Sequence, residues 1–279
     1  MQILLYLAIL PVVLLLKFIY NKDIDKEPRN LLKKIFIAGI ISVIPVVIFE
    51  LLLDNLFPTE GETDLLIILF NTFISIALVE ELFKFLSAFI FTRNSKEFNH
   101  RYDAIVYCVF AALGFAVVEN ILYVFSGGIG TAITRALISV PSHACDAVIM
   151  GFFYGLSQEQ KTKSNNLSSI ILLLTGILIP SIEHAAFDGL LAMAIASDEM
   201  GSDGVIYLFI LIIMVLVTYV ICFILVAITS KHNTNFDGTT LEQKKEVQTT
   251  LNSTEVRYCT NCGSQITGNF CSNCGIPRQ

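Results

Sequence analysis

The sequence predicts an all-α polytopic membrane protein with about seven transmembrane helices, followed by a small domain after the last helix. Of the 279 residues, 54% are hydrophobic and only 15% are charged, and the mean hydropathy is +0.71. Soluble domains carry about 25% charged residues, so this composition argues against an ordinary soluble enzyme. Apolar runs of about 20 residues, long enough to cross a bilayer, recur along the chain. No alternation typical of transmembrane strands is present, so helices are expected and a closed barrel is not.

The apolar runs divide the chain into three parts. They lie at residues 1–20, 35–56, 65–91, 104–126, 131–156, 167–193 and 205–229. We therefore expect residues 1–230 to form one seven-helix membrane domain. Residues 231–257 are polar and predict a flexible linker, and residues 258–279 predict a separate small domain.

The basic residues predict how the helices are oriented. Of the 18 lysines and arginines, all except Lys84 and Arg135 lie in or beside the first, third and fifth connections or in the tail. The second and sixth connections are acidic and contain no basic residue. Because cytoplasmic loops carry the excess of Lys and Arg, we expect a cell-membrane protein with its N-terminus outside and its tail in the cytoplasm. No basic patch suits nucleic acid, so no nucleic-acid partner is expected.

The segment 77–86 places three charged residues in the middle of an apolar helix. Glu80 and Glu81 are adjacent, and Lys84 lies angularly between them, about 40° from the first and about 60° from the second. Each charge at mid-membrane costs about 2.5 to 3.5 kcal/mol on insertion scales, which favours a functional site. A structural salt bridge that fixes helix packing is the alternative, and it leaves the second carboxylate unexplained.

Two further helices place polar residues at similar depths. Glu119 lies about 10 Å below the expected outer surface, counted at about 1.5 Å per residue. Arg135, Ser139 and His143 follow one another at i, i+4 spacing, so they predict a polar stripe that runs from the outer end of their helix to its centre. A single histidine in such a stripe is as often a packing residue as a ligand.

A second intramembrane histidine strengthens the functional interpretation. His184 and Asp188 are spaced i, i+4 just after Pro180, a pattern typical of a metal-ligand pair or of a histidine oriented by a carboxylate. Carboxylates and imidazoles that converge in the outer half of the bilayer can bind a divalent metal and activate water. The pattern therefore indicates metal-assisted hydrolysis in a cavity that opens to the outside.

Glu50 and Asp54 form another acidic i, i+4 pair, in the helix that contains Pro45. They lie near the expected outer end of their helix. We therefore expect these carboxylates to be solvated and to have no part in the site.

The polar positions resemble the motifs of the PrsW family of intramembrane proteases, which looks related to the CAAX prenyl endopeptidases and the bacterial Abi proteins. The resemblance covers the third to the sixth helix and rests on Glu80-Glu81-x-x-Lys84, Phe115-x-x-x-Glu119, Arg135 with His143 and Gly151, and His184-x-x-x-Asp188. It implies peptide-bond cleavage in membrane-anchored substrates, with anti-sigma factors as the best-known type of target.

The resemblance also implies roles for single residues. Glu80 or Glu81 would be the general base that activates water. Glu119, His143 and His184 would be ligands of a catalytic zinc or groups that orient the water, and Asp188 would orient His184. A glutamate mechanism without a tightly held metal is the alternative known from the related prenyl proteases.

Two other functional classes remain open from the sequence. A proton-coupled transporter can use buried carboxylates and histidines as a relay, but no inverted repeat is visible in the sequence. A non-catalytic membrane scaffold with an interaction module in its tail is the third possibility.

The tail ends in two Cys-x-x-Cys pairs, each followed by a glycine. The pairs are Cys259 with Cys262 and Cys271 with Cys274. Four thiolates satisfy tetrahedral zinc, so the spacing predicts a minimal zinc ribbon with a structural Zn²⁺. Disulfides are the alternative, which the expected cytoplasmic location disfavours. A cytoplasmic protein is the expected partner of the ribbon.

Overall fold

The computed structural model describes residues 2–58, 62–199, 204–232, 234–240, 243, 246, 257–266, 270–271 and 273–277. The chain divides into two compact units, Met1–Asp237 and Gly238–Gln279. The first unit is helical, and the described part of the second contains one short hairpin. Most of the expected linker 231–257 lies outside the described residues.

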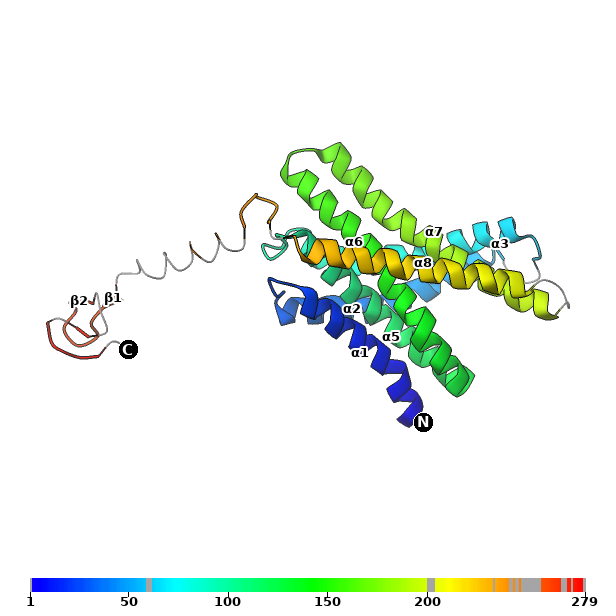
Figure 1. Cartoon of the computed structure of the whole chain (residues 1–279), viewed down its shortest axis with the longest axis horizontal. Helices are drawn as coiled ribbons and strands as arrows, with labels where there is room; N and C mark the ends of the chain where they lie inside the picture. Colours follow the sequence, from blue (N-terminus) through cyan, green and yellow to red (C-terminus); the bar gives the residue numbers. More distant parts are fainter. Residues whose placement is uncertain are drawn as a thin grey trace. The chain divides into compact units, whose positions relative to one another are not determined.

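The first unit is built mainly from long helices, with three shorter helical segments among them (Figure 1). In chain order these are α1 Gln2–Lys22, α2 Arg29–Asp54, α3 Leu65–Thr72, η1 Phe73–Ala77, α4 Leu78–Thr92, α5 Arg101–Thr134, η2 Arg135–Ser139, α6 Val140–Thr162, α7 Asn166–Glu199 and α8 Gly204–Ser230. Among the described residues, six helical stretches are long and apolar enough to cross a membrane. The prediction of an all-α membrane protein is confirmed.

One of the six stretches contains two of the seven predicted spans. Arg101–Thr162 runs for 62 residues, which as a straight helix would be about 93 Å long, about three times the hydrocarbon core. The helix breaks at Gly128, where φ is 76° and ψ is −157°. A glycine adopts this backbone conformation without a steric penalty, so the chain reverses there and α5 packs along α6.

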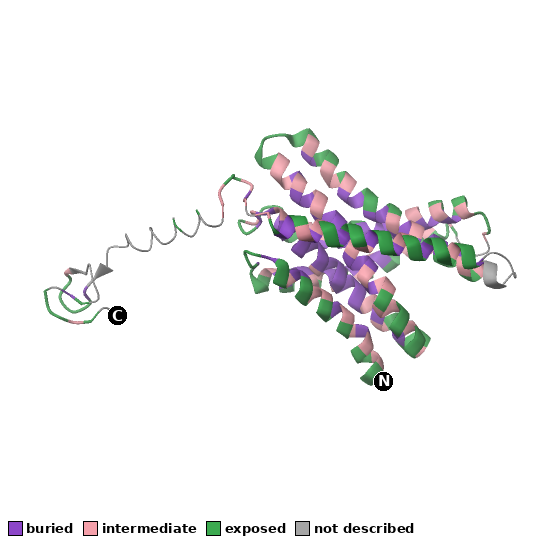
Figure 2. Cartoon of the chain, in the orientation of Figure 1, coloured by how far each residue is buried: buried purple, intermediate pink, exposed green. Residues whose placement is uncertain are grey.

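Helix α5 lies at the centre of the bundle. It packs against α1, α2, α4, α6 and α8 and is buried along most of its length (Figure 2). Gly114 lets α2 approach closely, because a Cβ at this position would lie 2.2 Å from the carbonyl oxygen of Phe36. Large apolar side chains on the outer faces of α2 and α8 are exposed, as expected for helices that face lipid.

Two π-helical turns precede the polar clusters. η1 lies directly before the helix turn that contains Glu80, and η2 lies directly before the one that contains His143. Pro141 has no N–H to donate to the carbonyl of Leu137, and the Tyr219 hydroxyl of α8 donates to that carbonyl at 3.1 Å instead. Such turns are frequent at functional sites, and helical periodicity alone did not predict them.

The bundle extends past the last predicted span. The Phe236 amide donates to the Asn99 carbonyl at 2.9 Å, and the Phe236 ring lies 5.4 Å from the Phe98 ring. This contact places the described residues 234–237 with the helical unit, although the composition changes to polar at residue 231.

Candidate active site

Lys84 is the central residue of the polar cluster. Its Nζ lies 2.7 Å from Glu80 Oε2, 2.8 Å from Glu81 Oε1 and 3.1 Å from His143 Nδ1. The Lys84 side chain is 0% exposed, and the ammonium lies 4.6 Å from the centre of the Phe115 ring. The helical spacing of residues 80–84 therefore brings both carboxylates to one ammonium, as the angles predict. This buried cation offsets part of the cost of two carboxylates in an apolar helix.

His184 of α7 lies against the same two carboxylates. Its Nδ1 is 2.9 Å from Glu81 Oε1, and its Nε2 is 3.9 Å from Glu80 Oε2 and 3.4 Å from Asp188 Oδ2. Asp188 is on the next turn of α7, so the i, i+4 spacing gives the expected contact. The imidazole is thus held between Glu81 on one side and Asp188 on the other.

His143 of α6 connects the cluster to α5. Its Nε2 lies 2.8 Å from Glu119 Oε2, while its Nδ1 faces Lys84. Glu119 Oε1 also pairs with Arg135 Nη2 at 3.0 Å, and Arg135 Nε donates to Asn120 Oδ1 at 3.0 Å. Arg135, the second basic residue inside the predicted helices, therefore fixes Glu119 beside His143.

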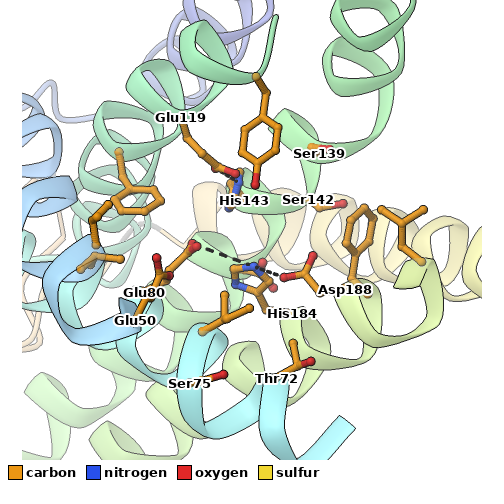
Figure 3. A pocket seen from close by; sticks show the side chains of 18 of the residues that line it. Glu50, Thr72, Ser75, Glu80, Glu119, Ser139, Ser142, His143, His184 and Asp188 are labelled. Carbon is orange, nitrogen blue, oxygen red and sulfur yellow. Dashed lines mark ion pairs between the residues drawn. The ribbon is translucent and has the colours of Figure 1, made fainter. Parts of the chain in front are cut away.

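A cavity of about 620 Å³ opens beside these residues (Figure 3). Glu80, Glu119, His143, His184 and Asp188 line it, whereas Glu81 and Lys84 do not. Figure 3 shows His143 beside Glu119, and His184 between Glu80 and Asp188. All seven predicted site residues thus belong to one group, in two layers: five face the cavity, and Glu81 and Lys84 lie behind them.

The polar stripe on α6 follows the predicted order, with an added residue. Arg135, Ser139, Ser142 and His143 all line the cavity. Ser142 lies three residues after Ser139, a spacing that also places two residues on one face of a helix. The i, i+4 pattern alone did not include Ser142.

The expectation that Glu50 is solvated is met only in part, because the residue is half-buried. Glu50 lines the cavity, and its Oε1 is buried without a hydrogen-bond partner in the described part of the chain. Glu80 lines the same cavity (Figure 3). Asp54, one turn further, also lines the cavity but is exposed. A residue near a helix end becomes buried when neighbouring helices surround it, and helix counting cannot show this.

Asp146 and Glu183 are cavity residues that the motif analysis did not select. Each is an acidic residue inside a predicted transmembrane helix, and this position is the sequence feature that could have identified it as a cavity residue. Glu183 directly precedes His184, and Asp146 lies three residues after His143.

The donor set of the cluster fits a divalent metal in type and proximity. One ligand atom from each of Glu80, Glu81, His143 and His184 lies within 4.8 Å of the others. Carboxylate oxygen and imidazole nitrogen are common zinc ligands, and Glu81 Oε2 is a buried oxygen without a hydrogen-bond partner in the described chain. Glu119 is not one of these four residues, and its Oε2 contacts His143 Nε2 instead.

The four tail cysteines form a second group of metal-ligating type. Cys259 Sγ lies 3.4 Å from Cys274 Sγ, and Cys262 Sγ lies 3.5 Å from Cys271 Sγ. β1 Arg257–Tyr258 and β2 Gln265–Ile266 pair antiparallel around the first knuckle. None of these cysteines forms a disulfide.

The turns of the two knuckles suit thiolates. Gly263 and Gly275 adopt φ of 69° and 74°, and their amides donate to the Cys259 and Cys271 carbonyls at 2.8 Å. Backbone N–H groups of Asn261 and Cys262 lower the pKa of the Cys259 thiol. Metal binding requires thiolates, so this local field favours the binding form.

Comparison with known proteins agrees with this geometry. Residues 27–223 match the family model described as PrsW family intramembrane metalloprotease. The chain is 34% identical over 187 residues to "Protease PrsW" of Geobacillus kaustophilus (strain HTA426), which covers 66% of this chain and 77% of the relative. It is 32% identical over 185 residues to "Protease PrsW" of Bacillus subtilis (strain 168), covering 66% and 80%. No solved structure gives a significant match.

Proposed function

Because the chain belongs to the PrsW family of intramembrane metalloproteases, we propose that Glu80 is the general base that activates water for cleavage of a membrane-anchored protein. The observation that carries this assignment is the two-layer arrangement of the cluster. Glu80 lines the cavity, whereas Glu81 is 0% exposed and lies behind it. Substrate and water enter through the cavity, so the carboxylate that faces it is the one that can take the proton.

Glu81 and Lys84 are positioning residues in this mechanism. Glu81 Oε1 contacts both Lys84 Nζ and His184 Nδ1, so it fixes the imidazole in one orientation. Lys84 Nζ lies 2.7 Å from Glu80 Oε2 and so keeps the Glu80 carboxylate in its place in the cavity wall. Neither side chain has to touch the substrate.

The chemical step needs a proton acceptor and a donor. Glu80 takes a proton from water as the water oxygen attacks the scissile carbonyl carbon, and it returns the proton to the leaving amide nitrogen. His143 and His184 line the same cavity, and their imidazole rings can stabilise the negative charge that develops on the carbonyl oxygen.

A divalent metal fits the same residues. Glu81, His143 and His184 would hold it and leave Glu80 free to take the proton, and it would supply polarisation of the carbonyl and a more acidic water. Glu119 and Asp188 would then orient the two histidine ligands, with His143 Nε2 and His184 Nε2 as the contacted atoms.

The substrate class and orientation follow from the sequence and the family. We place the N-terminus outside and the tail in the cytoplasm, and we expect the cut near the outer membrane surface of a single-span protein of anti-sigma-factor type. The stripe that begins at Arg135 supports entry of water from the outside. The cysteine group is proposed to bind a structural Zn²⁺, and the ribbon to contact a cytoplasmic protein.

The test compares Glu80→Gln with Glu81→Gln in the full-length protein. New protein N-termini generated in membranes are identified by mass spectrometry in cells that express either variant or the unchanged protein. The purified proteins are then assayed on the identified substrate in liposomes. Loss of the general base is expected to lower kcat by about 10²–10⁴ in Glu80→Gln.

The matched variant decides between the two carboxylates. Glu81→Gln is expected to retain measurable cleavage, with a smaller fall in kcat. This substitution only weakens the contact that orients the His184 imidazole. Cleavage at the unchanged rate in Glu80→Gln would disprove its role. Cleavage by Glu80→Gln but not by Glu81→Gln would reverse the assignment.

A further inference from the structure

Asn120 is a buried polar residue of α5 to which the proposed mechanism gives no role. It is 0% exposed and directly follows Glu119 in the sequence. Its Nδ2 donates a hydrogen bond to the Ala8 carbonyl of α1 at 2.7 Å, and its Oδ1 accepts one from Arg135 Nε at 3.0 Å. A carbonyl can only accept and an arginine can only donate, so these two partners fix the orientation of the Asn120 amide. A side-chain amide can serve both, because it carries an acceptor and a donor on the same carbon.

The Arg135 guanidinium transmits this orientation to Glu119. Its Nε is bound to Asn120, and its Nη2 lies 3.0 Å from Glu119 Oε1. The guanidinium is rigid and planar, so a fixed Nε also fixes the position of Nη2. The Tyr123 ring, whose centre lies 4.3 Å from the guanidinium carbon, covers one face of the group. Arg135 therefore contacts three residues of α5, and Asn120 is the most deeply buried of them.

Glu119 is the residue whose position matters for the proposed chemistry. Its Oε2 lies 2.8 Å from His143 Nε2, and both residues line the cavity. A carboxylate in this place orients the imidazole and determines which of its nitrogens carries the proton. The Glu119 side chain is 20% exposed, so packing alone does not hold it. Without Arg135 it can turn away from His143 into the cavity.

Helix α1 is at the other end of this series of contacts. It precedes residues 27–223, which match the family model, so the comparison gives it no part in the site. Ala8 is nevertheless fully buried and packs with Val124 and Ala132 of α5. Its carbonyl therefore has a fixed place beside α5 and can anchor the Asn120 amide.

We infer that Asn120 is a positioning residue of the active site, which connects Arg135, and through it Glu119, to α1. The inference rests on the proposed function, because it gives Asn120 an effect on the same reaction. Asn120 is not among the residues that line the cavity, so it acts on the reaction through Arg135 and Glu119. Loss of its amide should therefore lower kcat and leave KM nearly unchanged.

The first measurement is cleavage of the identified substrate. Asn120→Leu has nearly the same shape and no hydrogen-bonding group, and it should lower kcat about 10–100-fold, the range found for outer partners of histidine ligands. Arg135→Met should lower kcat at least as much. The double variant should be no slower than Arg135→Met alone, because Asn120 acts through the guanidinium. An unchanged kcat in Asn120→Leu, or multiplied losses in the double variant, would overturn the inference.

Tyr102→Phe is the matched control. Tyr102 is also buried on α5, and its hydroxyl donates to the Ile19 carbonyl of α1 at 3.0 Å. It lies near the first residue of α5 and does not line the cavity, so its loss should leave kcat unchanged. An equal fall of kcat in Tyr102→Phe would assign the effect to general packing of α1 on α5 and would overturn the inference. If Asn120→Leu does not fold, Asn120→Ser takes its place, because the shorter side chain cannot reach both partners.

The second measurement does not depend on cleavage. The imidazole nitrogens of ¹⁵N-histidine are observed by NMR in the full-length protein, and the His143 signals are assigned with His143→Gln. Asn120→Leu should shift the Nε2 resonance of His143, because the contact with Glu119 is loosened. Tyr102→Phe should not shift it. An unshifted His143 resonance in Asn120→Leu would overturn the inference for any substrate.

Ala8→Val tests the part assigned to α1. Because Ala8 is fully buried, the added methyl groups must move α1 away from α5 at this contact. The variant should lower kcat and shift the His143 resonance, whereas Val13→Ile, which adds a methyl group at an exposed position of α1, should do neither. Unchanged values in Ala8→Val would overturn the role of α1 as the anchor.

The outcomes separate the two proposals. If Asn120→Leu shifts the His143 resonance but Glu80→Gln cleaves at the unchanged rate, the proposed function fails and the series of contacts stands. If cleavage depends on Glu80 but neither kcat nor the His143 resonance depends on Asn120, the positioning role fails alone.

Discussion

The two ligand-rich clusters of this protein are organised by different forces. In the membrane cluster the Lys84 ammonium lies between two carboxylates at 2.7 and 2.8 Å, so a side chain of the protein supplies the positive charge. In the tail, four cysteine sulfurs approach one another at 3.4 and 3.5 Å, and the short hairpin around them offers little apolar core. Close ligand atoms therefore do not by themselves show dependence on a metal. The membrane cluster can be organised by ion pairs and helix packing, whereas the proposed role of the four tail cysteines would require an added cation.

Removal of metal from the tail should give the largest effect. Structural zinc contributes about 10 to 16 kcal/mol in small zinc domains near pH 7, more than this hairpin can replace. A strong chelator should therefore make residues 238–279 sensitive to limited proteolysis while the helical circular dichroism of the membrane unit is unchanged.

Single substitutions make this test specific. Cys259→Ser should reproduce the effect of the chelator, and Cys222→Ser, which changes a buried cysteine of α8, should not. Unfolding of the helical unit together with the tail would show that the two clusters share one requirement for metal.

Substitution of Lys84 tests whether its ammonium group stabilises the membrane cluster. Lys84→Met leaves Glu80 and Glu81 without their ammonium, and loss of one partner of a buried pair costs about 3–5 kcal/mol. The free energy of unfolding in mixed detergent measures this loss. Lys163→Met is the matched control, because Lys163 is 57% exposed in its pair with Glu159 and should contribute only about 0–1 kcal/mol.

A double variant identifies the cause of that loss. Lys84→Met combined with Glu81→Gln should be more stable than Lys84→Met alone, because the uncompensated charge is removed. If the double variant is less stable than either single one, packing and not charge explains the effect.

Glu27, in the loop before α2, differs from both clusters, because its buried carboxyl group has neither a metal nor a cationic side chain as a described partner. Burial raises the pKa of Glu27 to about 8, and Tyr107 donates a hydrogen bond to its Oε2. The folded-state pKa is higher than that of the unfolded chain, so the stabilisation from the bound proton is complete below about pH 4.5 and is lost as the pH rises through about 8.

The measurement is the free energy of unfolding between pH 5 and pH 9. The unchanged protein should lose on the order of a few kcal/mol across this range, and Glu27→Gln should flatten this part of the profile. An unchanged slope in Glu27→Gln would assign the pH dependence to other groups, such as Asp23, whose pKa burial raises to about 6.

Shortening the tail should have the smallest effect. Truncation after Asp237 removes only the second unit and should change the stability of the helical unit by less than about 0.5 kcal/mol. Truncation after Lys231 also removes the Phe236–Phe98 ring contact and should cost about 0.5–1.5 kcal/mol. Equal melting of the two truncated proteins would show that residues 234–237 do not stabilise the bundle.

Most of the architecture could be predicted because the bilayer imposes a length and a polarity on each helix. The apolar runs predict the helices, and the expensive charges inside them predict the site. Within one helix, periodicity also gives correct contacts: Lys84 with both glutamates, and His184 with Asp188. The spacing of Cys259, Cys262, Cys271 and Cys274 predicts their grouping for the same local reason.

What the sequence determined by itself was therefore the set of helices, the charged residues they bury and the pairs that one helix or one turn brings together. The packing of the helices against one another determines which of Glu80 and Glu81 faces the cavity, that Glu50 Oε1 is buried, and that Asp146 faces Glu183. The physical reason is that helical periodicity fixes angles about a single axis. The rotation of one helix against another depends on close approaches such as that of Gly114 to Phe36, and on π-helical turns that change the register before Glu80 and His143.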